Sequence, residues 1–415
     1  STYASVARDA MRAYFNNETT EMRQAESKAI SQLGTFETSK SLFVETESKI
    51  REYIKTKQYN YNTLLTEDLV ESIEEMKNMI SLHPSKKYYQ LSNKMNLFRL
   101  SNITSYISDV FNGKQSLYQK RTYDFRMPEF KSEKDKKKYL KDQKDLEGIF
   151  AIGTEVDTIA RQFFAEWSRQ KNAGIENPVI ADYAASLVDT VSLMNTLYAY
   201  ARAIDNYASI NGYDYEFLTD DAIVYDNSKA EIISKYVGQL DENGKEIEMS
   251  GVATAHDLLL RFKLKGDNKY QDVLLDFKTI RSVKNGQELF TDITEPVNDN
   301  DIDSEYRKGR NTSWKIQTEI NRRLFNKVHG ASISKTGILG FTKIVKDGKV
   351  TIAIPSNIMA SIEKNNEPWH DVSMKKKDAQ LKRLINTFTS YSKSNISLTE
   401  DETDNSEALN ICNNI

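Results

Sequence analysis

The sequence predicts an α/β fold that begins with a large helical region, and three observations support this. The 415 residues contain only 6 prolines and 16 glycines, a composition that favours long helices. Between Tyr215 and Ile280 the pattern changes to β-branched and alternating segments, which are typical of strands. Turn signals at 243–244 and 266–268 separate these segments, and the Asp-Gly at 347–348, between two later segments, is a strong hairpin signal.

The chain divides into three predicted parts. Residues 1–145 are expected to be mostly helical, with apolar residues at helical spacing between 67 and 82. A charged run at 131–147 is expected to form a solvated helix or linker, and we place a domain boundary near it. Residues 146–362 form the predicted core. Residues 363–415 hold a basic helix, around 374–387, and a polar, acidic tail that is expected to be disordered.

Composition excludes several classes of function. Lysine plus arginine (57) nearly balances aspartate plus glutamate (60), so a nucleic-acid surface has to be a local patch. The mean hydropathy of −0.61 and the lack of a long apolar run predict no membrane span, and the expected location is the cytoplasm. The one cysteine, Cys412, excludes an internal disulfide and an iron–sulfur cluster. No G-x-x-x-x-G-K-[ST] loop occurs, so no ATP site is expected.

Helices and strands alternate in the predicted core. A helix near 152–167 carries one apolar stripe, made of Val156, Ile159, Ala160, Phe163, Phe164 and Trp167. A second helix is expected over 178–210, ending near Asn211-Gly212, and a third over 313–328. Strands are expected at 337–345 and 349–355.

The segments 250–263 and 271–280 are expected to pair as a hairpin. If they close symmetrically about Gly266-Asp267, residues whose numbers sum to 533 lie opposite each other, so Asp257 faces Asp276. Because successive side chains of a strand point to opposite faces of the sheet, Lys278 is expected on the same face as Asp276 and Phe277 on the other.

Two facing carboxylates among apolar strands need a proton or a cation, and their oxygen ligands suit Mg²⁺ or Mn²⁺. The neighbouring His256 should point to the opposite face and serve packing or hydrogen bonding rather than bind a ligand. The alternative is that both aspartates are exposed on a half-buried sheet and Lys278 is an ordinary ion-pair partner. The residues alone weigh these two interpretations about evenly.

Four segments resemble the RecB-like exonuclease branch of the PD-(D/E)XK nucleases. LLDFKT at 274–279 is similar to the core D-x-K motif, and the strand from Gly251 to Asp257 resembles the one that precedes it. IGTEVDTIARQFF at 152–164 resembles the upstream G-T-x-x-H helix, and WKIQTEINRRLF at 314–325 resembles the downstream Q-x-x-x-Y helix. The segments occur in the family's order, and the resemblance covers about residues 146–362. The family's histidine and tyrosine fall on Asp157 and Asn321, two departures from its pattern.

The resemblance implies a mixed central sheet flanked by helices and a site for Mg²⁺ or Mn²⁺. The implied metal ligands are Asp157, Asp257, Asp276 and the backbone carbonyl of Phe277, with Glu155 as a second candidate. Asp257, Asp276 and Lys278 are the implied catalytic residues. The implied DNA contacts are Gln317, Asn321, Arg322, Arg307 and Arg310.

The expected function is therefore metal-dependent hydrolysis of DNA, most simply by an exonuclease. The resemblance places such a chain in DNA repair, recombination or phage biology, in a bacterial cell or phage-infected host. A helicase, a recombinase or a virion component is its expected protein partner. A competing interpretation is a nuclease-fold protein that binds DNA or scaffolds an assembly without cutting. A third is an interaction protein with chance motifs, which requires that Asp257 and Asp276 are not neighbours.

Overall fold

The computed structural model describes residues 78–389, except 86, 92–94, 181–182, 184, 219–221, 227–232, 282–301, 330 and 332. Its main helices are α5 (Leu100–Phe111), α6 (Glu133–Asn172), α7 (Thr190–Asn211), α9 (Ile302–His329), α10 (Ser356–Glu363) and α11 (Ala379–Thr389). Strands β1 to β6 are Ile80–Leu82, Tyr88–Leu91, Asn96–Arg99, Arg121–Tyr123, Tyr213–Leu218 and Ala222–Asp226. Strands β7 to β13 are Val237–Gln239, Val252–His256, Leu258–Leu264, Tyr270–Arg281, Ile333–Lys346, Lys349–Ala353 and His370–Asp371.

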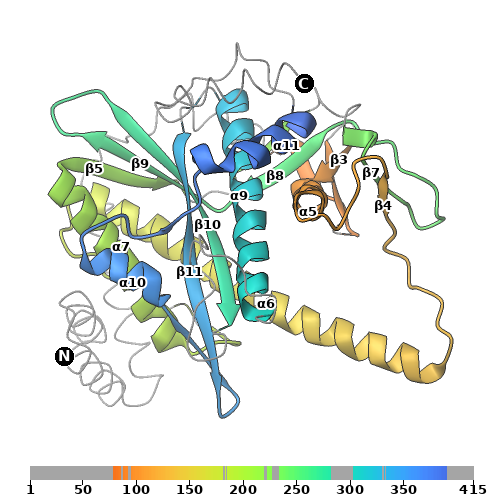
Figure 1. Cartoon of the computed structure of the whole chain (residues 1–415). Helices are drawn as coiled ribbons and strands as arrows, with labels where there is room; N and C mark the ends of the chain where they lie inside the picture. The colour runs from red at the N-terminus through yellow and green to blue at the C-terminus, as the bar shows by residue number, and fades with distance from the viewer. Residues whose placement is uncertain are drawn as a thin grey trace.

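A mixed sheet forms the centre of the molecule (Figure 1). Its strand order is β12-β11-β10-β9-β5, and β13 pairs with β11. β10 and β11 run parallel, whereas the other neighbours are antiparallel. The β11–β12 turn uses Asp347 and Gly348, both with positive φ (52° and 74°), which confirms the predicted hairpin.

Helices cover both faces of this sheet because its strands alternate apolar residues toward two separate cores. Leu258 and Leu260 of β9 pack with α6 and α7, together with the predicted helix stripe from Val156 to Trp167. Leu259 and Leu274 pack on the opposite face with Ile316, Ile320 and other apolar residues of α9 and α11. The model is therefore mixed α/β, as predicted.

A second sheet joins the N-terminal region to the core. Its order is β1-β2-β3-β8-β6, in which β3 pairs in parallel with β8. The described part of the predicted helical region, residues 78–145, thus contains four strands as well as α5 and the start of α6. Most of the helix expected over 67–82 lies outside the described residues, and its last three residues are β1.

Most of the charged run at 131–147 forms the beginning of the 40-residue helix α6, so the boundary drawn after residue 145 falls inside one helix. Ser132 caps α6 by accepting a hydrogen bond from the backbone N–H of Asp135 at 3.2 Å. No proline separates the charged run from the buried stripe, and the helix continues through Gly148 and Gly153. Among the residues described, no helix has the length and apolar character that crossing a bilayer requires.

The other element boundaries follow local caps. α7 begins at Thr190 rather than near 178, because Asp189 accepts a hydrogen bond from Ser192 N–H at 2.9 Å and caps it there. It ends as predicted at Gly212, whose φ is 71°. Residues 363–389 belong to the core, since β13 pairs with β11 and α11 packs on α5 and α9. The acidic tail at 398–415 lies outside the described residues.

Candidate metal and nuclease site

The β9–β10 hairpin has the predicted register. Its pairs run from Lys263–Tyr270 to Leu258–Leu275, and the numbers of each pair sum to 533. Asp257 and Asp276 come directly after the last pair, and the two carboxyls are close enough for Asp276 to raise the pKa of Asp257. The condition of the third interpretation, that these two residues are not neighbours, is therefore not met.

Asp257 is the single residue between β8 and β9, where the chain leaves one sheet and enters the other. Its Oδ1 accepts a hydrogen bond from Arg161 Nη2 at 2.6 Å, and its Oδ2 accepts one from the backbone N–H of Phe277 at 2.9 Å. The N–H and C=O of one residue in an extended strand point to the same side. The carbonyl of Phe277 is therefore also directed toward the edge where β9 has ended.

Lys278 lies beside Asp276, as the alternation of β10 predicts. Its Nζ is 2.7 Å from Asp276 Oδ2 and donates a hydrogen bond to Gln317 Oε1 of α9 at 3.2 Å. Phe277 turns to the other face and stacks on Phe164, with ring centroids 6.1 Å apart. The structure thus brings Gln317 to the predicted catalytic pair from a third element.

Asp157 of α6 completes a group of three acidic residues that repel one another. Burial and the charge of Asp257 raise the pKa of Asp157 to about 8. Burial and Asp276 likewise raise the pKa of Asp257 to about 8, although Arg161 and the N–H of Phe277 act in the opposite direction. The negative charge in this group exceeds what the nearby cations neutralise.

Lys278 is held in its charged form. Burial alone would lower the pKa of Lys278, but Asp276, Asp257 and Asp157 overcome this effect and raise it. A lysine in this environment is suited to stabilising negative charge or orienting a water rather than to accepting a proton.

The donor chemistry of the group fits Mg²⁺ or Mn²⁺, which prefer carboxylate and carbonyl oxygens. Within the described part of the chain, no three His, Cys, Asp or Glu side chains stand close enough together to form a ready metal-ligand set. Burial and the charge of a neighbouring aspartate nevertheless raise the pKa values of Asp157 and Asp257, and a divalent cation bound here would offset both effects. Arg161 and Lys278 supply the positive charge in the structure as it stands.

Two neighbouring residues have other partners. Glu155, the second candidate ligand, accepts hydrogen bonds from Ser186 Oγ at 2.8 Å and Leu187 N–H at 3.0 Å. The structure therefore does not bring Glu155 to the three aspartates. His256 is buried and packs edge-on against Phe325 at 5.1 Å, which agrees with its expected packing role.

The predicted DNA-contacting patch on α9 needs a correction. Arg322 and Arg323 are buried, and both bind the buried carboxylate of Glu319, at 2.8 and 2.9 Å. Asn321 is also buried, so neither Asn321 nor Arg322 is exposed for the predicted contact with a DNA phosphate. Arg310 is exposed, and the side chain of Arg307 lies outside the described residues.

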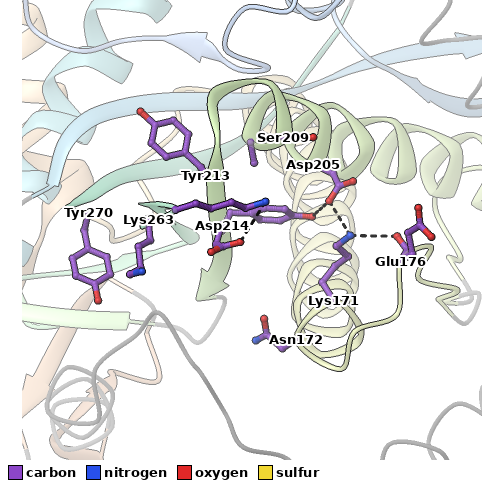
Figure 2. Close-up of a pocket in the computed structure, with 12 residues that line it drawn as sticks. Lys171, Asn172, Glu176, Asp205, Ser209, Tyr213, Asp214, Lys263 and Tyr270 are labelled. Atoms are coloured by element: carbon purple, nitrogen blue, oxygen red, sulfur yellow. Dashed lines mark hydrogen bonds and ion pairs between the residues drawn. The ribbon is translucent and has the colours of Figure 1, made fainter. Parts of the chain in front are cut away.

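A cavity of about 740 Å³ lies away from this group, at the hairpin end of β9 (Figure 2). Its charged groups neutralise one another: Lys171 binds Asp205 at 3.0 Å, and Lys265 lies 3.9 Å from Asp214. None of the predicted site residues lines it. The aspartate group carries the unbalanced charge, so we take it and not the cavity as the candidate site.

Arg161 is the site residue that the sequence interpretation missed. It lies one helical turn after Asp157, a spacing that places both residues on one face of α6. That spacing was the available signal, but no sequence motif marks an arginine that lies beside a metal site.

Comparison with protein-family models, curated proteins and solved structures found no match for this chain.

Proposed function

We propose that the chain is a metal-dependent DNA nuclease whose site is built from Asp257, Asp276 and Lys278. The observation that carries this proposal is the meeting of two acidic side chains at the end of the β9–β10 hairpin, with an ammonium group 2.7 Å from one of them. A carboxyl group whose pKa is raised by burial and by a facing acidic residue, as that of Asp257 is, is typical of functional sites.

The topology supports a PD-(D/E)XK type of core. The D-x-K strand β10 pairs antiparallel with β9 and parallel with β11, and helix α9 lies between β10 and β11 in sequence. Helix α6 brings Asp157 to the group, and α9 brings Gln317, the order that the resemblance implies.

The residues of this site would have distinct roles in the reaction. Asp257, Asp276, the Phe277 carbonyl and Asp157 would hold the metal, whose role is to lower the pKa of a water and neutralise charge on the scissile phosphate. Lys278, kept charged by its acidic neighbours, would stabilise charge that develops on the phosphate in the transition state. Gln317 would keep the ammonium group of Lys278 in position.

A digestion assay tests the proposal. The full chain is incubated with linear duplex, closed circular and single-stranded DNA, in Mg²⁺, in Mn²⁺ and in chelator. We expect cleavage that depends on the metal, with loss from free ends if the enzyme is an exonuclease. DNA binding without any product in either metal contradicts the proposal and favours the alternative below.

Replacing Lys278 with alanine is expected to lower the cleavage rate about 100- to 1,000-fold, because the transition state loses a positioned charge. DNA affinity should change little, since one side chain among many phosphate contacts is lost. Single-turnover rates and a filter-binding titration separate the two effects. A loss of DNA affinity with an unchanged single-turnover rate would assign Lys278 to binding instead.

Replacing Arg161 with glutamine is expected to tighten Mn²⁺ binding about tenfold, because Asp257 is freed from a charged hydrogen bond. Isothermal titration of Mn²⁺ into the protein measures this without DNA. Arg169→Gln is the matched control, since Arg169 lies on the same helix and binds Glu166 instead. Weaker binding by the Arg161 variant would show that the guanidinium supports the metal site.

One observation favours the alternative, a nuclease-fold protein that binds DNA or scaffolds an assembly without cutting. Arg161 bound to Asp257 provides a charge that satisfies the carboxylate in place of a metal. In a protein that never binds metal, Arg161→Gln would only destabilise the fold, and the titration would detect no Mn²⁺ binding by either variant.

A further inference from the structure

A second cavity, of about 650 Å³, lies where the chain leaves β4 and β7, two strands that pair in parallel (Figure 1). Its lining residues come from three segments: 83–88, which ends at the start of β2, 125–127 after β4, and 239–247 from the end of β7 onward. None of the residues of the candidate metal site lines it. It is therefore a separate place at which a ligand could bind.

Aromatic rings and one buried amide line this cavity. Tyr88 stacks on His83, with ring centroids 4.3 Å apart, and Phe125 is 43% exposed. Gln239 is only 1% exposed, and its side-chain oxygen Oε1 has no hydrogen-bond partner among the described residues. Because a buried acceptor without a donor is unfavourable, a ligand that brings an N–H group would be stabilised here.

The two cations that line the cavity are engaged by neighbouring side chains. Arg126 donates two hydrogen bonds to the carboxylate of Asp124, from Nε at 2.9 Å and from Nη2 at 2.8 Å. The Nζ of Lys87 lies over the ring of Phe125, 4.3 Å from its centroid. Neither cation is placed to donate to the amide oxygen of Gln239.

The two acidic residues of the cavity differ in their surroundings. The Oδ1 atom of Asp241 accepts hydrogen bonds from the backbone N–H groups of Asn243 and Lys245, at 2.8 and 2.9 Å, and so belongs to a turn. Glu242 is exposed and forms no ion pair within the described part of the chain. The carboxylate of Glu242 is therefore an acceptor that a ligand can use.

The wall of the cavity that contains Glu242 is acidic. Residues 239–248 hold four acidic residues and one lysine, a net charge of −3. Burial and the charges of Glu242 and Asp241 together raise the pKa of the neighbouring Tyr88. The ring of Tyr88 thus lies in a negative potential, which favours a cation beside it.

We propose that this cavity binds the guanidinium group of an arginine side chain that belongs to a partner protein. A guanidinium group is flat and cationic, stacks on aromatic rings, and donates several N–H groups in one plane. Glu242 and the amide oxygen of Gln239 would accept these N–H groups. DNA fits the cavity less well, because the acidic wall repels phosphate. The cavity would bind arginine in the same way whether the chain cuts DNA or only binds it.

NMR of the full chain, labelled with ¹³C on its methionine methyl groups, tests the proposal. Met127 lines the cavity and is 60% exposed, so its methyl signal reports on a ligand there. We expect an acetylated Gly-Arg-Gly amide to shift this signal. The lysine peptide should bind more weakly because an ammonium group lacks the flat array of donors, and the uncharged citrulline peptide should not bind. No shift at millimolar arginine peptide, or equal shifts with all three peptides, would overturn the proposal.

Two variants test the assigned acceptors. Glu242→Gln is expected to weaken binding of the arginine peptide at least about tenfold, because a charged hydrogen bond is lost. Glu248→Gln is the matched control, since Glu248 is exposed on the same segment but does not line the cavity. Gln239→Leu should also weaken binding without lowering the melting temperature, because it removes a buried acceptor that has no partner. Equal binding by wild type and both cavity variants would contradict the proposal.

A single-stranded DNA oligonucleotide is the competing ligand. It should leave the methyl signal of Met127 unchanged when chelator is present to prevent cleavage. A shift caused by the oligonucleotide and not by the arginine peptide would assign the cavity to nucleic acid and overturn the proposal.

Discussion

Replacing Asp276 with asparagine is expected to lower metal-dependent DNA cleavage at least about a thousandfold. The amide keeps the shape of the carboxyl but loses the charge that would face a divalent cation and the ammonium group of Lys278, 2.7 Å away. Cleavage of linear duplex DNA under single-turnover conditions, in Mg²⁺ and in Mn²⁺, measures the effect.

The control for this variant is Asp267→Asn, in the turn of the same hairpin. Asp267 has a side chain that is 41% exposed and a lysine neighbour at 3.9 Å, so it matches the change in charge without touching the site. It should cleave like the wild type. Equal activity of the Asp276 variant and the wild type, in preparations free of other nucleases, would remove the assigned site.

Replacing Glu319 with glutamine is expected to lower the free energy of unfolding by about 3–5 kcal/mol. The carboxylate of Glu319 is buried and holds the two buried guanidinium groups of Arg322 and Arg323. Removal of its charge leaves both cations without their anion inside the protein. Urea unfolding measures the loss. The exposed residue Asp214 gives the control, Asp214→Asn, which should change stability by less than about 0.5 kcal/mol.

The stabilisation by Glu319 should depend on pH. Burial would raise the pKa of Glu319, but Arg322 and Arg323 overcome it and lower the pKa from 4.5 to about 2. An acid with a lowered pKa contributes its full stability above the unfolded value and loses it as the pH falls through the folded value. The difference between wild type and Glu319→Gln should therefore be constant above about pH 5 and shrink toward pH 2. A difference that grows on acidification would contradict the assigned pKa.

The sequence was sufficient to predict those parts of the site that depend on local rules. The Gly266 turn and the alternation of its flanking strands determine the register of the hairpin, and that register places Asp257 and Asp276 together. The helical period of Val156 to Trp167 likewise predicted the buried face of α6.

Other parts depend on pairings between distant segments, which local patterns do not encode. Strands β1 to β3 are three or four residues long, and β3 is completed by β8, more than 150 residues later. In the sequence, Arg322 and Arg323 look like part of a basic surface patch. Their structural role is apparent only from the fold, which buries both arginines with the carboxylate of Glu319. Arg161 reaches Asp257 across 96 residues of sequence.

The junction at Asp257 limits how this chain can change. His256 is hydrogen-bonded into one sheet opposite Ala222, and Leu258 is bonded into the other opposite Leu275. Side chains in a strand alternate between the two faces of the sheet. One inserted or deleted residue here would therefore move the side chains of one strand to the opposite face and expose residues such as Leu258 and Leu260 to water. Insertions and deletions at this junction should therefore be tolerated less well than substitutions of most side chains around it.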